Sequence, residues 1–266
     1  MNRHDVRSRI LEKRFLAPRH VWMRLECDWD PARVQPGQFL HLWLPELRDP
    51  LLRRPYTIYR IRPGEVEILF QVVGKGSGLL AEREPGERVH LLGPLGRGFA
   101  LPEPGTRALI VGGGVGMASL FLLIQRLREQ EFEVEVFIGA RSRDYLLCRD
   151  EAAESGALVW LATEDGSEGF AGLVTELVAQ RLERNPPERA VLYGCGPTPM
   201  MEALAKVGAA HRLPTYVALE NRMGCALGVC LGCVVPIRRE GTSRYERVCT
   251  EGPVFEAAQV CWGFRI

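Results

Sequence analysis

Four of the eight cysteines crowd into one short segment near the end of the chain, and thiols at this spacing could bind metal. The pattern is Cys225-x4-Cys230-x2-Cys233, followed after fifteen intervening residues by Cys249. Four thiolates can hold two irons in tetrahedral sites, and this spacing is typical of a [2Fe–2S] cluster. Small residues between the cysteines let the backbone wrap closely and direct N–H groups at the sulfurs. The segment is therefore predicted to bind a [2Fe–2S] cluster through all four cysteines.

Structural zinc is the alternative for this segment, because zinc is also bound tetrahedrally by four cysteines. Such zinc sites usually contain two closely spaced pairs of the Cys-x2-Cys type. Here only Cys230 and Cys233 have that spacing. The iron–sulfur interpretation is favoured, and a colourless protein with stoichiometric zinc would refute it.

The tetrapeptide Arg54-Pro55-Tyr56-Thr57 contains three groups that suit a flavin. An arginine can clamp a pyrophosphate with two hydrogen bonds, an aromatic ring can cover the isoalloxazine, and a hydroxyl can hydrogen-bond its reactive edge. Twenty residues on, 74–78 reads GKGSG, where glycines let the chain approach a phosphate and a following helix offers its first amides. Two phosphate-binding devices together indicate a dinucleotide flavin.

Two glycine-rich turns indicate a second nucleotide. The first, VGGGVG at 111–116, closes a predicted strand and opens a helix, so a dinucleotide phosphate could reach the helix amides. It departs from G-x-G-x-x-G and is only suggestive by itself. The second is YGCGP at 193–197, again between a strand and a helix. Without further information, Cys195 within it is interpreted as a small buried residue.

The elements that must position these residues change in character along the chain. Residues 1–102 contain short strand-like runs at 21–27, 39–45, 57–62, 66–73 and 87–93, which predict an antiparallel β-barrel. Residues 103–214 alternate strand and helix, which predicts an α/β domain with a parallel sheet and helices on both faces. Residues 215–266 are rich in Gly and Cys and too poor in apolar residues to form a core unaided.

Composition excludes several classes of protein. The formal charge of +1, from 34 basic and 33 acidic residues, is unlike the charge of a nucleic-acid binder or of a protein on an anionic membrane. The longest apolar run, 108–124, is interrupted by four glycines and is better interpreted as strand, turn and helix than as a membrane span. The first ten residues have no apolar core, so no secretory signal is expected and a cytoplasmic location is predicted.

The order of RPYT, GKGSG, GPLGRGF at 93–99, VGGGVGMASL, YGCGP and the cysteines resembles the electron-transfer subunit of the bacterial B-type dihydroorotate dehydrogenases. The resemblance spans essentially the whole chain and extends to the wider ferredoxin–NADP reductase group. It implies that FAD is bound by the segments matching 54–57, 70–72 and 76–77. The residues concerned are Arg54, Pro55, Tyr56, Thr57, Phe70, Gln71, Val72, Gly76 and Ser77.

The same resemblance implies that NAD is bound at the two glycine-rich turns. It places Cys195 beside the nicotinamide, so Cys195 and Thr57 are the predicted catalytic residues. The residues predicted to bind NAD are Gly112, Gly113, Gly114, Gly116, Gly194, Cys195, Gly196 and Pro197. Arg141 and Arg143 could bind a 2′-phosphate, but Asp144 complicates that interpretation and the family uses NAD.

The function implied is electron transfer from a dihydroorotate-oxidising catalytic subunit, through [2Fe–2S] and FAD, to NAD⁺ in pyrimidine (UMP) biosynthesis. A flavin suits the middle position because it exchanges both single electrons and hydrides. The family implies a heterotetramer of two catalytic and two electron-transfer subunits. Two alternatives remain open. One is a related NAD(P)H-linked subunit that serves a sulfite reductase, a hydrogenase or ferredoxin, and the other is a zinc-stabilised binding module.

Overall fold

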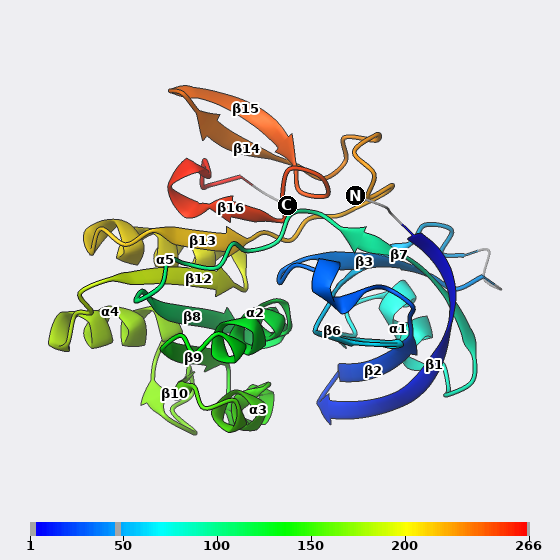
Figure 1. The fold of residues 1–266 in the computed structure, drawn as a ribbon, viewed down its shortest axis with the longest axis horizontal. Coiled ribbons are helices and arrows are strands. Elements are labelled where there is room, and N and C mark those ends of the chain that lie inside the picture. Colours follow the sequence, from blue (N-terminus) through cyan, green and yellow to red (C-terminus); the bar gives the residue numbers. More distant parts are fainter. Residues whose placement is uncertain (1–3, 46–48, 265–266) are drawn as a thin grey trace.

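The computed structural model of the chain describes residues 4–45 and 49–264, and its first third forms a seven-stranded antiparallel sheet in the order β4-β3-β7-β1-β2-β6-β5. The sheet curls until its ends meet, because β4 packs against β6 and the Tyr59 amide donates to the Glu67 carbonyl at 2.9 Å. The predicted antiparallel barrel is confirmed (Figure 1). The strands are β1 (His4–Ala17), β2 (His20–Glu26), β3 (Phe39–Trp43), β4 (Arg54–Thr57), β5 (Arg60–Arg62), β6 (Glu65–Gln71) and β7 (Arg88–Leu95).

The long strand β1, central in this sheet, is absent from the runs that the sequence analysis names. It pairs with both β2 and β7. Its pairing with β2 shifts register between Ile10 and Glu12 and again between Phe15 and Ala17. Each irregularity interrupts the two-residue alternation of inward and outward side chains, so the strand has no clean apolar period.

The second part of the chain is an α/β unit. Strands β10, β9, β8, β12 and β13 are parallel neighbours in one sheet. Apolar side chains of α2 and α3 pack on one face, and those of α4 and α5 pack on the other, which confirms the predicted arrangement. The elements are β8 (Arg107–Gly113), α2 (Met117–Glu129), β9 (Val134–Ala140), α3 (Arg149–Glu154), β10 (Leu158–Thr163), β11 (Phe170–Ala171), α4 (Val174–Arg184), β12 (Ala190–Cys195), α5 (Thr198–Ala210) and β13 (Thr215–Ala218).

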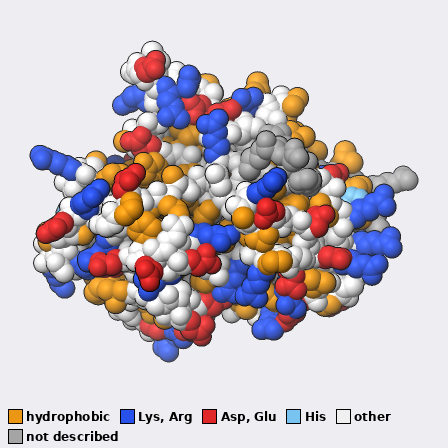
Figure 2. Space-filling view, in the orientation of Figure 1, with side chains coloured by type: hydrophobic (Ala, Val, Ile, Leu, Met, Phe, Trp, Pro, Cys, Tyr) orange, Lys and Arg blue, Asp and Glu red, His pale blue; other side chains and the backbone are white. Residues whose placement is uncertain are grey.

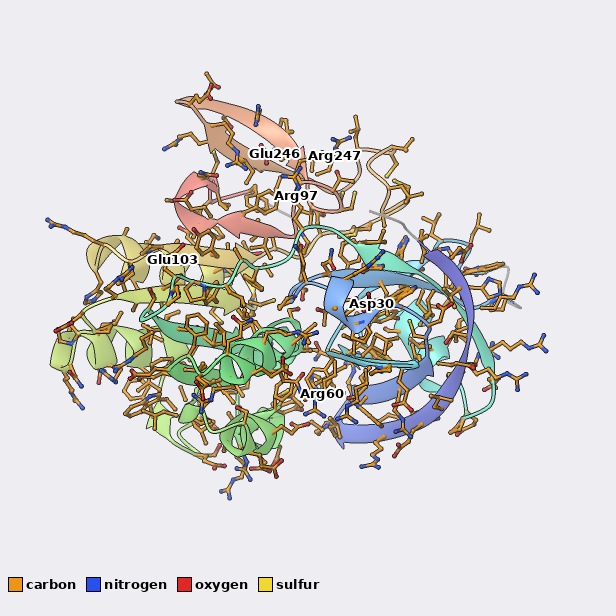
Figure 3. All side chains as sticks on the ribbon, in the orientation of Figure 1. Asp30, Arg60, Arg97, Glu103, Glu246 and Arg247 are labelled. Carbon is orange, nitrogen blue, oxygen red and sulfur yellow. The ribbon has the colours of Figure 1, made fainter. Side chains whose placement is uncertain are left out.

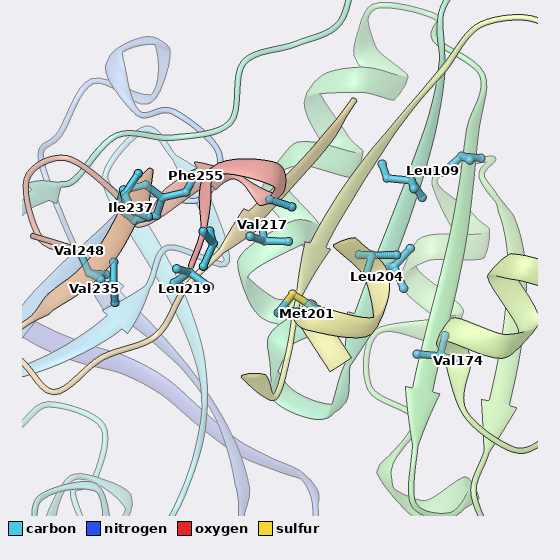
Figure 4. Close-up of a cluster of buried hydrophobic side chains, with 14 of the residues drawn as sticks. Leu109, Val174, Met201, Leu204, Val217, Leu219, Val235, Ile237, Val248 and Phe255 are labelled. Atoms are coloured by element: carbon cyan, nitrogen blue, oxygen red, sulfur yellow. The ribbon is translucent and has the colours of Figure 1, made fainter. Parts of the chain in front are cut away.

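The C-terminal part builds on this second sheet. Strand β16 (Val254–Glu256) pairs antiparallel with β13, and the hairpin of β14 (Val234–Arg239) and β15 (Thr242–Arg247) stands above it. The sheet therefore continues past residue 214, where the sequence analysis divides the second and third domains. Apolar side chains of the hairpin join the core of the α/β unit through Val217 and Leu219 (Figure 4). This shared core compensates for the small number of apolar residues beyond 215.

The loop at 93–99 joins the barrel to the C-terminal part. The Arg97 amide donates to the Gly252 carbonyl at 2.6 Å, and Arg97 forms a parallel bridge with Pro253. The Cβ atom that a larger residue would carry at Gly96 would lie 2.5 Å from Pro253 Cδ. Because Gly96 has a positive φ as well, both its conformation and its close contact require glycine there.

The surface carries both signs of charge. Basic and acidic side chains are interspersed over the face in Figure 2, with arginines over the β14–β15 hairpin. None of the described helices combines the length and apolar character that a membrane span needs.

Candidate flavin and iron–sulfur sites

A cavity of about 530 Å³ lies where the barrel, the α/β unit and the C-terminal part meet. It brings together segments that are far apart in the sequence, from the start of β3 to the residue before β16. Its lining is largely apolar with a few polar groups, as is usual for a small-molecule site. The residues around it are Gly37, Phe39, Arg54, Pro55, Tyr56, Thr57, Leu69, Phe70, Gln71, Val73, Gly74, Lys75, Gly76, Ser77, Val115, Ser119, Cys195, Ala218, Leu219, Glu220, Asn221, Met223 and Pro253.

Arg54 lies against the first turn of α1 (Lys75–Ala81), as a phosphate clamp requires. Its guanidinium donates to the carbonyls of Leu52 and Arg53, and no carboxylate among the described residues pairs with it. A Cβ atom at Gly76 would lie 2.8 Å from Arg54 Nε, so glycine makes room for the guanidinium. The charge of Arg54 thus remains free to meet an anion in the cavity.

Ser77 organises the same turn through its hydroxyl. Its Oγ accepts from the amides of Val73 and Gly74, at 3.0 and 3.1 Å, and donates to the Gly74 carbonyl at 3.0 Å. The hydroxyl is therefore engaged in capping the helix. The groups free to bind a phosphate are the amides of the first helical turn, which have no partner within the helix.

Tyr56, Thr57 and Phe70 form the wall that a flavin ring would need. The rings of Tyr56 and Phe70 pack with centroids 5.0 Å apart. Thr57 Oγ1 is buried and has no hydrogen-bond partner within the described residues. An orphaned hydroxyl in a cavity wall is costly unless a ligand engages it. The residues present therefore fit FAD.

Val72 is the one residue of the predicted FAD set that does not line the cavity. Its amide donates to the Arg19 carbonyl at 2.7 Å, and its carbonyl accepts from Arg19 Nε at 2.9 Å. Phe70 and Gln71, by contrast, both line the cavity. The direct structural role of Val72 is to hold the end of β6 against the β1–β2 turn.

Cys195 ends β12 and lines the cavity together with Ser119. Burial, and then the nearby carboxylate of Glu220, raises the pKa of Cys195 to about 12. The thiol is therefore neutral at physiological pH. A neutral thiol can pack against a ring and donate a weak hydrogen bond, but it is a poor nucleophile. This chemistry suits a residue that positions a nicotinamide.

Glu220 follows β13 and faces the same cavity. Its side chain is exposed to the open cavity, but the protein atoms around the cavity partly desolvate the carboxyl and raise its pKa above the ordinary value. A carboxyl with a raised pKa beside a thiol and a hydroxyl is a candidate functional group. The sequence analysis does not name it, although the carboxyl end of a parallel strand is where ligands bind in such sheets.

The two glycine-rich turns meet because β8 and β12 are parallel neighbours, with Gly112 opposite Cys195. A Cβ atom at Gly116 would lie 2.4 Å from the Cys195 carbonyl oxygen, and one at Gly196 would lie 3.2 Å from the Gly113 amide nitrogen. Close packing of the two turns thus requires glycine at both positions. The other residues predicted to bind NAD lie next to the cavity lining rather than in it; they are Gly112, Gly113, Gly114, Gly116, Gly194, Gly196 and Pro197. Their contact with NAD stays a prediction.

The four clustered cysteines form two pairs. The Cys230 amide donates to Cys225 Sγ at 3.4 Å, and burial followed by the nearby Cys233 thiol raises the pKa of Cys249. The second pair is brought together by the β14–β15 hairpin, because Val234 pairs with Arg247 and the Val248 amide donates to the Cys233 carbonyl at 3.0 Å. The hairpin therefore closes the long gap between the third and fourth cysteines.

Backbone amides surround the first pair. Cys225 Sγ accepts from the amides of Leu227 and Cys230, each at 3.4 Å. Burial alone would raise the pKa of Cys225, but the amides lower it to about 6. The segment thus stabilises a thiolate before any metal is bound, as an iron ligand requires.

The four thiols lie close together but are not gathered around a single point. Within the described residues, no three His, Cys, Asp or Glu side chains converge on one point where a single ion could bind. Four thiols at the spacing of this segment suit two irons in tetrahedral sites. The cysteines therefore fit a [2Fe–2S] cluster.

The cavity and the cysteine segment share a wall that the sequence analysis did not foresee. Met223 lines the cavity and lies two residues before Cys225, while Pro253 lines it and lies four residues after Cys249. Ser119 and Asn221 are further lining residues that the sequence analysis does not name. Ser119 lies within the VGGGVGMASL stretch, but only the packing of distant segments shows that it and Asn221 reach the cavity.

The cavity lies between an antiparallel barrel and a parallel nucleotide-binding sheet, and the cysteine segment lies on its far wall. This arrangement defines a reductase of the ferredoxin-reductase type. Two family models match the chain. The iron-sulfur cluster binding domain of dihydroorotate dehydrogenase B matches residues 220–261, and the oxidoreductase NAD-binding domain matches residues 110–206.

Solved structures share this architecture. An NADH-dependent reduced ferredoxin-NADP oxidoreductase is 29% identical, with a TM-score of 0.84 over 96% of this chain and 90% of that one. The ferredoxin reductase of carbazole 1,9a-dioxygenase is 26% identical, with a TM-score of 0.71 over 80% of this chain and 68% of that one.

Curated relatives match almost end to end. The dihydroorotate dehydrogenase B (NAD(+)) electron transfer subunit of Desulforamulus reducens is 42% identical over 96% of this chain and 97% of its own length. The protein of the same name from Bacillus caldolyticus is 39% identical over the same shares. The chain belongs to the family of dihydroorotate dehydrogenase B electron transfer subunits.

Proposed function

We propose that this protein passes electrons from a dihydroorotate-oxidising catalytic subunit, through a [2Fe–2S] cluster and FAD, to NAD⁺ in pyrimidine biosynthesis. FAD supplies the exchange between single electrons and a hydride, and the cluster supplies single-electron transfer. The names of the relatives favour dihydroorotate as the electron source over the sulfite reductase, hydrogenase or ferredoxin partners left open by the sequence.

One observation carries this proposal: the cavity and the cysteine segment are two sides of the same wall. Met223 and Pro253 line the cavity, and each lies within four residues of a cysteine of the cluster segment. Electrons that enter at the cysteines need to cross only this wall to reach the cavity. The other side of the cavity holds Cys195, where the nicotinamide is expected.

The protein's own residues do the binding and orienting. We assign Arg54 and the first-turn amides of α1 to the FAD phosphates, and Thr57 to the edge of its ring. Tyr56 and Phe70 exclude water from that ring. Cys195 positions the nicotinamide as a neutral thiol, and we assign the glycine-rich turns to the nucleotide of NAD.

The catalytic partner is expected to dock over the cysteine loop. Cys230 is exposed, and three apolar side chains of the same loop, Leu227, Val229 and Leu231, are 38%, 79% and 60% exposed. Apolar side chains exposed together on a loop indicate a contact surface.

We propose that the complex contains two catalytic and two electron-transfer subunits. We further propose that it works in the cytoplasm and that NAD is the electron acceptor.

The test is to mix the purified chain with its catalytic partner and follow NADH formation from dihydroorotate. Coupled NADH formation is expected, and a lack of coupling in a complex that contains FAD and iron would refute the assignment. Cys230→Ser should stop transfer from the partner while leaving reduction of the flavin by NADH intact. Cys261→Ser, outside the cluster segment, should leave both reactions unchanged.

A further inference from the structure

Arg247 lies at the foot of the β14–β15 hairpin and contacts both parts of the cysteine site (Figure 3). Its Nη1 donates to the Gly228 carbonyl at 2.8 Å, within the loop that carries the first three cysteines. Its main-chain amide and its Nε each donate to Glu251 Oε2 at 2.8 Å, and its Nη2 donates to Glu251 Oε1 at 2.5 Å. A single guanidinium thus links the cysteine loop to the turn that carries Cys249.

The fit of the loop against this turn is close. Gly228 has a φ of +82°, and a Cβ atom there would lie 2.9 Å from Thr250 Cγ2 and 3.3 Å from Arg247 Nη1. Thr250 Oγ1 in turn hydrogen-bonds Glu251 Oε1 at 3.1 Å. The loop from Cys225 to Cys233 contains no helix or strand, so contacts of this kind determine how firmly it is held.

Arg247 also brings a charge close to one cysteine pair. It lies two residues before Cys249, and across the hairpin it pairs with Val234, the residue that follows Cys233. The other arginines bonded in this hairpin, Arg239 and Arg244, bind Glu246 farther along the strands. Arg239 donates two hydrogen bonds to Glu246, at 3.1 and 3.2 Å, and so resembles Arg247 in its pairing. Within the described residues it makes no hydrogen bond with the cysteine loop.

We propose that Arg247 is a positioning residue for the cluster: it holds the cysteine loop closed and keeps a fixed positive charge beside the Cys233–Cys249 pair. The contact between Arg247 and the loop slows loss of the cluster, because residues that hydrogen-bond a ligand-bearing loop hold its ligands in the orientation that binds the metal. The charge favours the reduced, more negative cluster and so raises its reduction potential. This inference rests on the proposed [2Fe–2S] cluster.

The experiment compares three substitutions with the wild-type chain. Arg247→Gln removes both the charge and the forked geometry, Arg247→Lys keeps the charge but loses the fork, and Arg239→Gln removes the matched pair away from the loop. Iron and acid-labile sulfide are assayed, the bleaching of visible absorbance by a chelator gives the rate of cluster loss, and a redox titration followed by electron paramagnetic resonance gives the potential. None of these readouts depends on enzyme turnover.

Both Arg247 variants are expected to lose the cluster faster, by roughly 10–100-fold. The reduction potential should fall in Arg247→Gln, where Glu251 is left unneutralised, and should stay near the wild-type value in Arg247→Lys. Glu251→Gln leaves Arg247 without its counter-charge and should shift the potential upward. Arg239→Gln should match the wild type in rate and potential.

An Arg247→Gln protein with the wild-type rate of cluster loss and the wild-type potential would overturn the role of Arg247 alone. A wild-type chain that contains zinc and no sulfide would overturn the cluster assignment itself. If Arg247→Gln does not fold, Arg247→Lys and Glu251→Gln still test the loop contact and the charge separately.

Discussion

The hydroxyl of Tyr59, in the barrel, donates to Glu151 Oε1 of α3 at 2.9 Å and so joins the two nucleotide-binding parts of the molecule. The Tyr59 ring is fully buried against Phe121 of α2, with centroids 4.8 Å apart. Arg60 lies over both rings and also bonds Glu151, at 3.2 Å. The relative placement of flavin cavity and nicotinamide turn therefore depends on an apolar contact fixed by one small polar network.

Replacing Tyr59 by Phe keeps the ring and removes this hydrogen bond. We expect the free energy of unfolding to fall by about 1.5–3 kcal/mol, the usual range for a hydrogen bond to a charged group. Urea denaturation of the two proteins measures the difference. Tyr245→Phe is the matched control, because Tyr245 is 75% exposed and should change stability by less than ~0.5 kcal/mol. Equal effects of the two substitutions would contradict a role for the Tyr59–Glu151 bond.

Gly76→Ala tests the phosphate clamp. The new Cβ atom would lie 2.8 Å from Arg54 Nε and would displace the guanidinium. We expect FAD to bind about tenfold more weakly, a change of about 1.4 kcal/mol. Gly78→Ala, in the same helix, meets nothing within 4 Å and serves as the control. Flavin titration of the apoprotein gives both affinities, and an undiminished affinity in Gly76→Ala would count against Arg54 as the clamp.

Stability is expected to fall steeply in alkaline solution because of buried thiols. Burial raises the pKa of Cys27, Cys148 and Cys195 to about 12 each. In the unfolded chain a thiol ionises near pH ~8.5, so between that pH and about 12 the unfolded state binds fewer protons than the folded state. Each buried thiol should therefore reduce the free energy of unfolding by up to about 1.4 kcal/mol per pH unit.

Cys148→Ser isolates one of these contributions. Serine does not titrate in this range. Between pH 9 and 11 the free energy of unfolding should therefore fall less steeply with pH in the variant, by up to about 1.4 kcal/mol per pH unit, the contribution of one proton. The comparison uses the slope with pH, which a small packing defect leaves unchanged. Parallel slopes for the two apoproteins would show that Cys148 ionises equally in both states.

Glu220→Gln tests the carboxyl that faces the cavity. Desolvation raises the folded pKa of Glu220, so its charged form opposes folding at pH values above the unfolded pKa of about 4.3. The variant should therefore gain stability over the wild type at pH 7 and lose that advantage at pH 4. Glu202→Gln, which breaks only the surface pair with Lys206, should show no such gain at pH 7. Chemical denaturation of the apoproteins at both pH values decides the matter.

Residue types and spacing were enough to predict several parts of the site. The number and spacing of four cysteines indicated two irons: Cys225, Cys230, Cys233 and Cys249. A [2Fe–2S] cluster needs four thiolates at a characteristic spacing, and both features can be read from the sequence. The strand runs and the strand–helix alternation predicted the barrel and the parallel sheet, since periodicity reports which faces are buried. Resemblance was needed to name Phe70 and Gln71, which carry no motif.

Tertiary structure alone decided how these parts meet. The pairing of β8 with β12 brings the two glycine-rich turns together, and the β14–β15 hairpin brings Cys249 to Cys233. Glu220, Met223 and Pro253 became part of the site because distant segments pack around one cavity. Local sequence determines which chemistry a segment can perform, whereas contacts between segments far apart in the chain depend on the whole core and are decided only when it packs.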